Sequence, residues 1–172
     1  RARGVNPHGL SLKRVLVGGE PWSGEARRQI EEGLGVTATD NYAVSELMGP
    51  GVASECLERN GLHVNEDHFL VEVIDPRTLE PVPPGERGEL VITTLSKEAF
   101  PIVRFRTHDL TSLIPEPCPC GRTLVRMRRI EARSDDMFIV KGVNVFPAQV
   151  EAVLREMDGR EAPRHQIVIE RK

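Results

Sequence analysis

A short apolar segment at residues 13–17 (KRVLV) is followed at once by two glycines and then by a helical pattern. This order restricts the fold more than any other feature of the sequence. The helical pattern begins at Ser23, which can cap it, and runs to about Leu34. Residues 37–42 have the composition of a second short strand. We therefore predict a βαβ unit over about residues 13–42, with two parallel strands joined by a right-handed crossover.

Beyond this unit the pattern changes to strands and tight turns. Residues 69–74 and 89–94 have the apolar composition of strands, and the Pro- and Gly-rich turn DPRTLEPVPPGERG lies between them. In the basic stretch Arg122–Arg133, arginines are interleaved with apolar side chains, which predicts a strand with one solvated face rather than a nucleic-acid surface. We predict a β-rich subdomain over about residues 61–134.

The C-terminal part returns to mixed helix and strand. Residues 137–140 are predicted to form a strand, Pro147 opens a helix that runs to about Met157, and residues 166–169 are predicted to form another strand. A separate small α/β domain is therefore expected to begin at Asp135. The fold class as a whole is α/β with α+β character. Because the first residue is an arginine and the last segment is a lone strand pattern, we expect a piece of a longer protein.

The composition excludes several classes of protein. The chain has 172 residues, a formal charge of −3 and 4% aromatic residues, which is ordinary globular material. No apolar run approaches the length that crosses a bilayer, so we expect no membrane partner, and the weakly acidic balance argues against nucleic acid. There is no signal-peptide pattern, and we expect a cytoplasmic protein. The sequence leaves open whether two copies form a homodimer.

Three short segments carry groups suited to a ligand. Gly18 and Gly19 let a flat ligand approach the backbone closely, although a simple tight turn explains them equally well. Ser45 and Glu46 place a hydroxyl and a hard carboxylate ligand for Mg²⁺ at the end of a strand, and the alternative is a capping serine beside a solvated acid. Asp109 can accept hydrogen bonds from the two vicinal hydroxyls of a ribose, or it can cap a turn.

Four longer motifs occur in one order along the chain: VGGEPW, YAVSELMGPGVASEC, GELVITTL with FPIVRFRTHDL, and RSDDMFIVKGVNVFPAQVEAVL. In this order and at about these separations, residues 15–154 resemble the phenylacetate–coenzyme A ligases, a branch of the adenylate-forming superfamily. The GVNVFP segment is typical of that branch. The resemblance implies that residues 1–134 are the C-terminal portion of the large adenylate-binding domain and that residues 135–172 begin the small mobile C-terminal domain, which is truncated here.

The resemblance also implies a two-step reaction. An aryl acid such as phenylacetate attacks ATP to give an acyl adenylate and pyrophosphate, and coenzyme A then displaces AMP to give the thioester. The family's phosphate-binding loop and its C-terminal catalytic lysine lie outside this sequence, so we expect the chain to be inactive alone. Two alternatives stay open. One is a related enzyme that loads the acid onto a carrier protein, and the other is a non-catalytic nucleotide-binding module.

The resemblance assigns roles to individual residues, with ATP or AMP, Mg²⁺ and coenzyme A as ligands. Asp135 would be the hinge between the two domains, for which the alternative is an acidic turn before a strand. His108 stands where members of the superfamily often carry glycine. The remaining roles are the adenine pocket for Gly18, Gly19 and Glu20, the base for Tyr42, the phosphate for Ser45, Mg²⁺ for Glu46, the ribose for Asp109, the nucleotide for Arg133, and the pantetheine arm of coenzyme A for Gly142.

The three cysteines suggest a second site. A disulfide between Cys118 and Cys120 would be badly strained, and a cytosolic enzyme keeps its thiols reduced. These two cysteines and Cys56 are instead three ligands for a tetrahedral Cys₃His zinc site, with His63 or His68 as the fourth. We favour His63, because the segment around His68 recurs in relatives that are not expected to bind metal. Three free buried thiols are the alternative.

Overall fold

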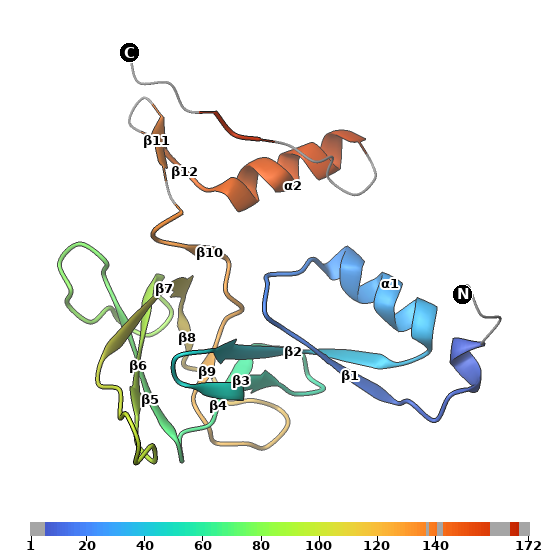
Figure 1. Ribbon diagram of the computed structural model, residues 1–172, viewed down its shortest axis with the longest axis horizontal. Helices are drawn as coiled ribbons and strands as arrows, with labels where there is room; N and C mark the ends of the chain where they lie inside the picture. Colours follow the sequence, from blue (N-terminus) through green and yellow to red (C-terminus); the bar gives the residue numbers. More distant parts are fainter. Residues whose placement is uncertain (1–5, 137, 141–142, 159–165, 169–172) are drawn as a thin grey trace.

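The computed structural model describes residues 6–136, 138–140, 143–158 and 166–168 (Figure 1). A 3₁₀ turn, η1 (Pro7–Gly9), precedes the first strand, β1 (Arg14–Val17), which pairs in parallel with β2 (Thr37–Val44). Helix α1 (Gly24–Leu34) connects the two strands, and the hydroxyl of Ser23 accepts a hydrogen bond from the Ala26 N–H at its start. The predicted βαβ unit is confirmed.

The first sheet continues into the β-rich region. Its strand order is β1-β2-β3-β4-β9-β8, and all of its pairs after β1·β2 are antiparallel. The added strands are β3 (Met48–Glu55), β4 (Leu62–Val64), β8 (Leu113–Ile114) and β9 (Arg126–Met127).

The second sheet is antiparallel throughout, with the order β10-β7-β6-β5. Its strands are β5 (Phe69–Ile74), β6 (Gly88–Thr94), β7 (Phe105–Thr111) and β10 (Ala132–Arg133). The predicted hairpin is confirmed, because β5 and β6 pair in continuous register from Phe69 opposite Thr94 to Ile74 opposite Glu89.

The hydrophobic core lies between the two sheets. It takes side chains from β3, β4 and β9 on one side and from β5 and β6 on the other, so the two sheets form one packed unit. Its buried members are Leu47, Val52, Ala53, Leu62, Val64, Phe69, Leu90, Ile92 and Met127.

Beyond β10 the chain leaves the sheets and forms a small hairpin and a helix (Figure 1). Strands β11 (Phe138–Val140) and β12 (Val143–Val145) pair antiparallel, and α2 (Pro147–Asp158) follows, as the Pro147 signal predicted. The predicted strand at residues 166–169 is wrong where the structure describes it. Residues 166–168 are in no strand, because no strand in the described part of the chain pairs with their backbone. No helix in the described ranges is long and apolar enough to cross a membrane.

The basic stretch Arg122–Arg133 is not the single half-solvated strand that its pattern predicted. It forms only the two-residue strands β9 and β10, with irregular chain around them. Arg126 is 2% exposed, and its guanidinium donates to the backbone carbonyls of Asn60 and Glu116. Burial is tolerated because these carbonyls replace the water that the cation loses.

Candidate functional site

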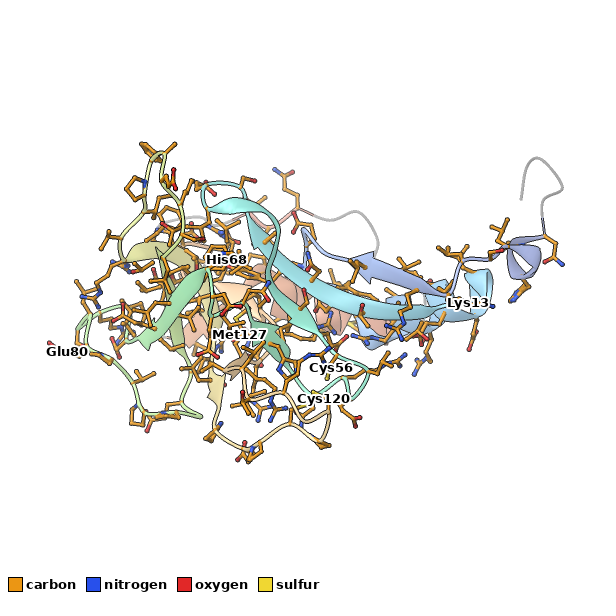
Figure 2. The ribbon with its side chains drawn as sticks, turned by 90° about the horizontal axis from the view of Figure 1, so that it is seen from below. Lys13, Cys56, His68, Glu80, Cys120 and Met127 are labelled. Carbon is orange, nitrogen blue, oxygen red and sulfur yellow. The ribbon has the colours of Figure 1, made fainter. Side chains whose placement is uncertain are left out.

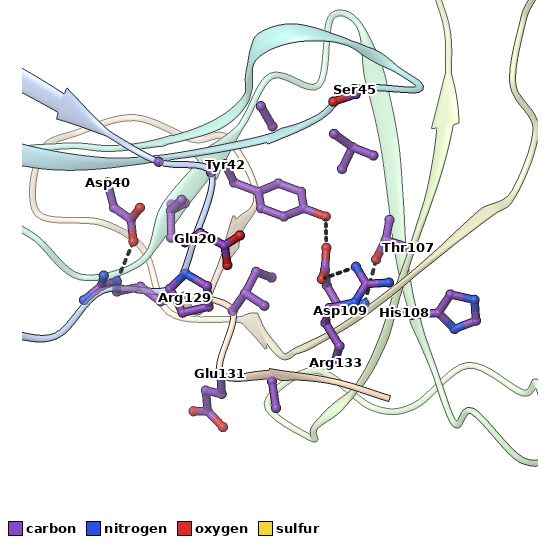
Figure 3. A pocket seen from close by; sticks show the side chains of 18 of the residues that line it. Glu20, Asp40, Tyr42, Ser45, Thr107, His108, Asp109, Arg129, Glu131 and Arg133 are labelled. Carbon is purple, nitrogen blue, oxygen red and sulfur yellow. Dashed lines mark hydrogen bonds and ion pairs between the residues drawn. The ribbon is translucent and has the colours of Figure 1, made fainter. Parts of the chain in front are cut away.

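A cavity of about 750 Å³ lies between the ends of β1 and β2 and strands β7 and β10 (Figure 3). This is the usual size of a small-ligand pocket. All of the nucleotide-contacting residues expected from the sequence that fall in the described ranges line it: Gly18, Gly19, Glu20, Tyr42, Ser45, Glu46, Asp109 and Arg133. Segments far apart in the sequence therefore converge on one cavity. Gly142 lies outside the described residues.

The two glycines after β1 are required by the backbone itself. A Cβ on Gly18 would lie 2.1 Å from the carbonyl oxygen of Asn41 on β2, and Gly19 has a φ of +97°. The tight turn suggested by the sequence is therefore present, with Gly18 packed against the backbone of β2, while the approach of a flat ligand to these glycines stays a prediction.

Tyr42 and Arg133 hold the carboxylate of Asp109 from two sides (Figure 3). The Tyr42 hydroxyl donates to Oδ2 at 2.5 Å, and Nη1 of Arg133 lies 3.4 Å from Oδ1. Asp109 is 9% exposed, and it lies within strand β7 rather than in a turn. Burial raises the pKa of Asp109 and outweighs the opposing effects of Tyr42 and Arg133. Burial likewise raises the pKa of Tyr42, so its phenol remains a hydrogen-bond donor.

Arg133 also forms an ion pair with Asp135, at the point where the chain leaves the second sheet. Its Nε and Nη2 donate to the two carboxylate oxygens of Asp135 at 3.0 and 2.7 Å. These hydrogen bonds lower the pKa of Asp135. Asp135 does not itself line the cavity, but the shared arginine links it to Asp109 inside the cavity.

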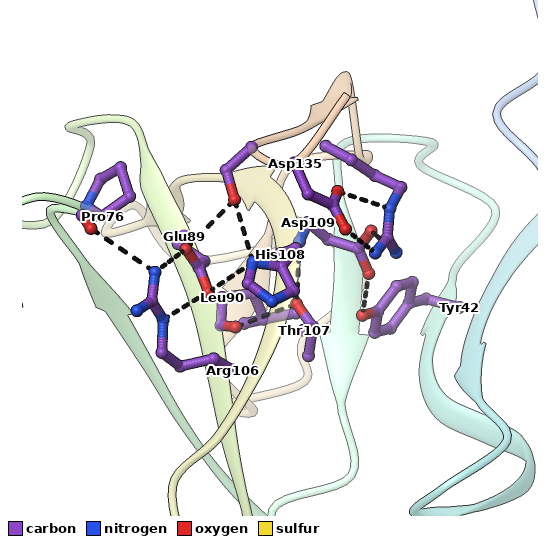
Figure 4. Close-up of polar contacts among 11 residues, drawn as sticks. Tyr42, Pro76, Glu89, Leu90, Arg106, Thr107, His108, Asp109 and Asp135 are labelled. Carbon is purple, nitrogen blue, oxygen red and sulfur yellow. Dashed lines mark hydrogen bonds and ion pairs between the residues drawn. The ribbon is translucent and has the colours of Figure 1, made fainter. Parts of the chain in front are cut away.

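A second buried carboxylate, Glu89 on β6, lies close to the first (Figure 4). Arg106 donates to it through Nε at 2.8 Å and Nη2 at 2.7 Å, and the Ser134 hydroxyl donates at 3.2 Å. The Nδ1 atom of His108 lies 3.5 Å from Oε1. Burial alone would raise the pKa of Glu89, but the hydrogen bonds and charge of Arg106 lower it overall. We define Glu89, Arg106, His108 and Ser134 as the Glu89 network.

Sequence reasoning assigned no role to several charged residues that also line the cavity, among them Asp40 and Arg129. Nε of Arg129 lies 2.5 Å from Oδ2 of Asp40, and Nη2 of Arg129 donates to the Trp22 carbonyl at 2.8 Å. The Arg129 guanidinium also lies 5.0 Å from the centre of the Trp22 ring. Arg129 belongs to the basic stretch that its pattern assigned to a solvated surface, so the sequence held no separate signal for it.

Ser45 and Glu46 lie in the turn between β2 and β3, and both line the cavity. Both are exposed, and neither belongs to a helix, which excludes the capping alternative. The Lys97 ammonium donates to the Glu46 carbonyl at 2.9 Å and leaves the carboxylate facing solvent. An exposed carboxylate at the rim fits Mg²⁺, which keeps several waters and takes few protein ligands.

The cysteines converge at a second place in the structure. Cys56 follows β3, His63 lies on β4, and Cys118 and Cys120 lie in the loop before β9. The sulfur atoms and a ring nitrogen of His63 all lie within 4.8 Å of one another. Burial raises the pKa of Cys56, while the backbone of Arg122 lowers that of Cys120 to about 7. His68 is exposed and is not part of this cluster; its Nδ1 lies 2.7 Å from the Ser96 hydroxyl.

Comparison with known proteins identifies relatives along the whole chain. No family model matches it. The chain is 54% identical to a phenylacetate–coenzyme A ligase of Thermus thermophilus and 47% identical to one of Escherichia coli K12, over 100% of this chain and 39% of each relative. The chain thus spans about two fifths of the length of these curated relatives.

Solved structures agree with this match. The chain superposes on 2-hydroxyisobutyryl-CoA ligase in an open conformation, in complex with 2-HIB-AMP and CoA, with a TM-score of 0.82 and 32% identity. That match covers 97% of this chain and 40% of the ligase. The same ligase in the thioesterification state gives 0.70 at 31% identity, over 92% of this chain and 34% of the ligase.

The mixed sheets and the convergent cavity thus define part of an adenylate-forming enzyme. Within that superfamily, the curated relatives that match the whole chain are phenylacetate–coenzyme A ligases, the branch that its four motifs indicated.

Proposed function

We propose that the protein containing this chain activates an aryl acid such as phenylacetate with ATP and transfers the acyl group to coenzyme A. AMP and pyrophosphate are the other products. The observation that carries the proposal is the convergence of Gly18, Gly19, Tyr42, Asp109 and Arg133 on one cavity. The names of the relatives, phenylacetate–coenzyme A ligases, support the choice of acid and acceptor.

In this proposal the nucleoside lies between the glycine turn and β7. The bare backbone at Gly18 and Gly19, beside Glu20, admits the flat adenine base against Tyr42. Asp109 accepts hydrogen bonds from the two ribose hydroxyls. Its raised pKa supports this role, because a buried carboxylate short of donors gains most from a ligand that brings two. Arg133 then faces the phosphate side of the nucleotide.

The rim of the cavity would carry the reacting phosphate. Ser45 can donate a hydrogen bond to a phosphate oxygen, and Glu46 would hold Mg²⁺ together with water and phosphate oxygens. When bound, the metal ion neutralises phosphate charge while the carboxylate of the acid attacks. Water must be kept from the adenylate until the thiol arrives, which calls for a part of the protein that closes and reopens.

We place the boundary between the large and the small domain at residues 134–135, with Asp135 as the hinge. The pair Arg133–Asp135 lies where the chain leaves β10, and the elements described after it are the β11–β12 hairpin and α2. The lower similarity to the ligase in its thioesterification state supports a rotation of this part between the two half-reactions. Gly142, outside the described residues, is proposed to face the pantetheine arm.

The reaction is tested with the full-length enzyme. Pyrophosphate release should depend on ATP, Mg²⁺ and an aryl acid, and an acyl–coenzyme A thioester should appear when coenzyme A is added. Aliphatic acids of similar size and a carrier protein serve as alternative substrates. Pyrophosphate release without thioester, or thioester formation on the carrier protein alone, would overturn the assignment of the acceptor.

The hinge is tested by Asp135→Pro, because proline fixes φ at the joint. One half-reaction should stay nearly intact while the other falls by about tenfold or more. Asp135→Ala is the matched control, since it removes the ion pair with Arg133 but leaves the backbone free. Equal losses in adenylate and thioester formation, or no loss in either, would rule out a hinge at this residue.

A further inference from the structure

We propose that Cys56, His63, Cys118 and Cys120 bind one structural zinc ion. The ion would tie the loop before β9 to the ends of β3 and β4. Figure 2 shows Cys56 beside Cys120, with His68 well away from both. None of the four ligands lines the nucleotide cavity, so the proposal is independent of the proposed reaction.

The distances fit a tetrahedral metal site. Zinc binds sulfur at about 2.3 Å and imidazole nitrogen at about 2.0 Å, which at tetrahedral angles places two sulfurs about 3.8 Å apart and a sulfur and a nitrogen about 3.5 Å apart. The Sγ atoms of Cys56 and Cys118 are 3.7 Å apart, and Sγ of Cys120 lies 3.5 Å from Nε2 of His63. A disulfide would need sulfurs at about 2.05 Å.

The surroundings of the cluster fit the charge of such a site and the direction of the His63 ring. His63 is 4% exposed and directs Nε2 at Cys120, so a metal there would bind the nitrogen that already faces the sulfurs. Three thiolates around Zn²⁺ leave one net negative charge. Arg122 compensates it, because its Nη1 lies 3.6 Å from Sγ of Cys120. Four protein ligands close the coordination sphere, which is the pattern of a structural site rather than a catalytic one.

The local fold explains why a metal is needed here. The segment between β8 and β9 contains Pro115, Pro117 and Pro119, and no helix or strand is described in it. The flanking strands are two residues long each. So little regular structure provides few hydrogen bonds to hold the loop, and metal binding energy would replace them as folding energy. The free-thiol alternative offers only weak S–H hydrogen bonds.

Elemental analysis of the full-length protein, purified without added metal, tests the site. We expect about one zinc per chain. The Cys120→Ser variant should lose most of the zinc. Cys120 is chosen because it is less buried than Cys56 and Cys118, so that replacing it disturbs the core least. His68→Ala is the matched control and should keep its zinc. A folded protein without metal, or one with iron in place of zinc, overturns the proposal.

A spectroscopic measurement keeps the proposal testable if the ligand variants fail to fold. Wild-type protein is stripped of zinc with a chelator and refilled with Co²⁺. A tetrahedral Cys₃His site predicts intense visible bands and sulfur-to-cobalt charge transfer, together with a lower unfolding temperature for the stripped protein. Weak octahedral bands would overturn the site. If the cobalt-loaded protein shows the tetrahedral spectrum but does not bind ATP, the zinc site stands and the proposed nucleotide site is contradicted.

Discussion

Two buried carboxylates on neighbouring strands differ in how completely the protein satisfies them. Glu89 on β6 is 0% exposed, and it receives two hydrogen bonds from Arg106 and one from Ser134. Asp109 on β7 receives one short bond from Tyr42 and a long contact from Arg133. The pKa of Glu89 is lowered, whereas the pKa of Asp109 is raised.

The difference separates a structural carboxylate from one poised for a ligand. The folded protein compensates the charge of Glu89 fully, so this residue stabilises the packing of β6, β7 and the chain at Ser134. The carboxylate of Asp109, at the edge of the cavity, receives fewer hydrogen bonds than the carboxylate of Glu89. A titratable group that faces a cavity and has a shifted pKa is a candidate for function. We therefore expect replacement of Glu89 to affect folding, and replacement of Asp109 to affect nucleotide binding.

The largest effect should come from Glu89→Ala. Breaking a buried pair costs about 3–5 kcal/mol, and we expect about 3 kcal/mol because the Arg106 side chain is 39% exposed and can regain water. Chemical denaturation of the full-length enzyme measures the loss. The matched control is Glu72→Ala, which breaks the more exposed pair with Arg104 and should cost at most about 1 kcal/mol. Equal losses in the two variants would show that Glu89 is not the better-satisfied carboxylate.

Asp109→Ala should weaken ATP binding more than it lowers the stability of the fold. Losing two charge-assisted hydrogen bonds to the ribose should weaken ATP binding by about 2 kcal/mol, which is roughly 30-fold. Calorimetry with the full-length enzyme measures the affinity, and denaturation should show a change of no more than about 1 kcal/mol. Unchanged ATP affinity would show that Asp109 does not bind the nucleotide. Asp109 would then not differ from Glu89 in function.

The sequence predicted the part of this picture that local patterns encode. The βαβ unit and the β5–β6 hairpin follow from apolar runs between turn residues. Strand β3 was missed because its sequence, MGPGVASE, contains turn residues, and only pairing with β2 and β4 makes it a strand. Arg126 was placed on the surface because a pattern of arginines does not show which one meets buried carbonyls.

The candidate site was reached differently. The resemblance predicted Gly18, Gly19, Glu20, Tyr42, Ser45, Glu46, Asp109 and Arg133, and the structure brings these residues together in one cavity. The Glu89 network had no such signal. A glutamate at the start of an apolar strand normally faces solvent, and its partner Arg106 meets it only across a register shift between β6 and β7. The local hydrophobic periodicity of a sequence does not show which side chains meet across neighbouring strands.

The pH dependence of stability should have opposite signs for the two carboxylates. The lowered pKa of Glu89 gives stabilisation that is present above the unfolded value of about 4.3 and is lost as the pH falls through the folded value. The raised pKa of Asp109 gives destabilisation at neutral pH that is relieved as the pH falls through its folded value. Glu89→Gln should thus be less stable than wild type at pH 7, and Asp109→Asn at least as stable.

Urea denaturation between about pH 3 and pH 7 tests both signs, because the two acids titrate in this range. Each variant should approach the wild type at the acid end. A loss of stability in Asp109→Asn at pH 7 would mean that the protein satisfies Asp109 as fully as it satisfies Glu89.

The smallest effect concerns His108, which joins the Glu89 network at a strained backbone position. Its φ is +63°, a conformation that favours glycine, and its Nδ1 lies 3.3 Å from the Ser134 hydroxyl. His108→Ala keeps the strain and loses the contact, so we expect a loss of about 1 kcal/mol. His108→Gly loses the contact but relieves the strain, so its net change should be smaller.

A double-mutant cycle decides whether His108 acts through Glu89. If it does, the loss caused by His108→Ala should largely disappear in the Glu89→Gln background, because the charge that the imidazole faces is gone. Denaturation of the two single variants and the double variant at one pH gives the coupling. Additive losses would show that the His108 side chain acts independently of Glu89, through its contact with the Ser134 hydroxyl. The Glu89 network would then consist of Glu89, Arg106 and Ser134 without His108.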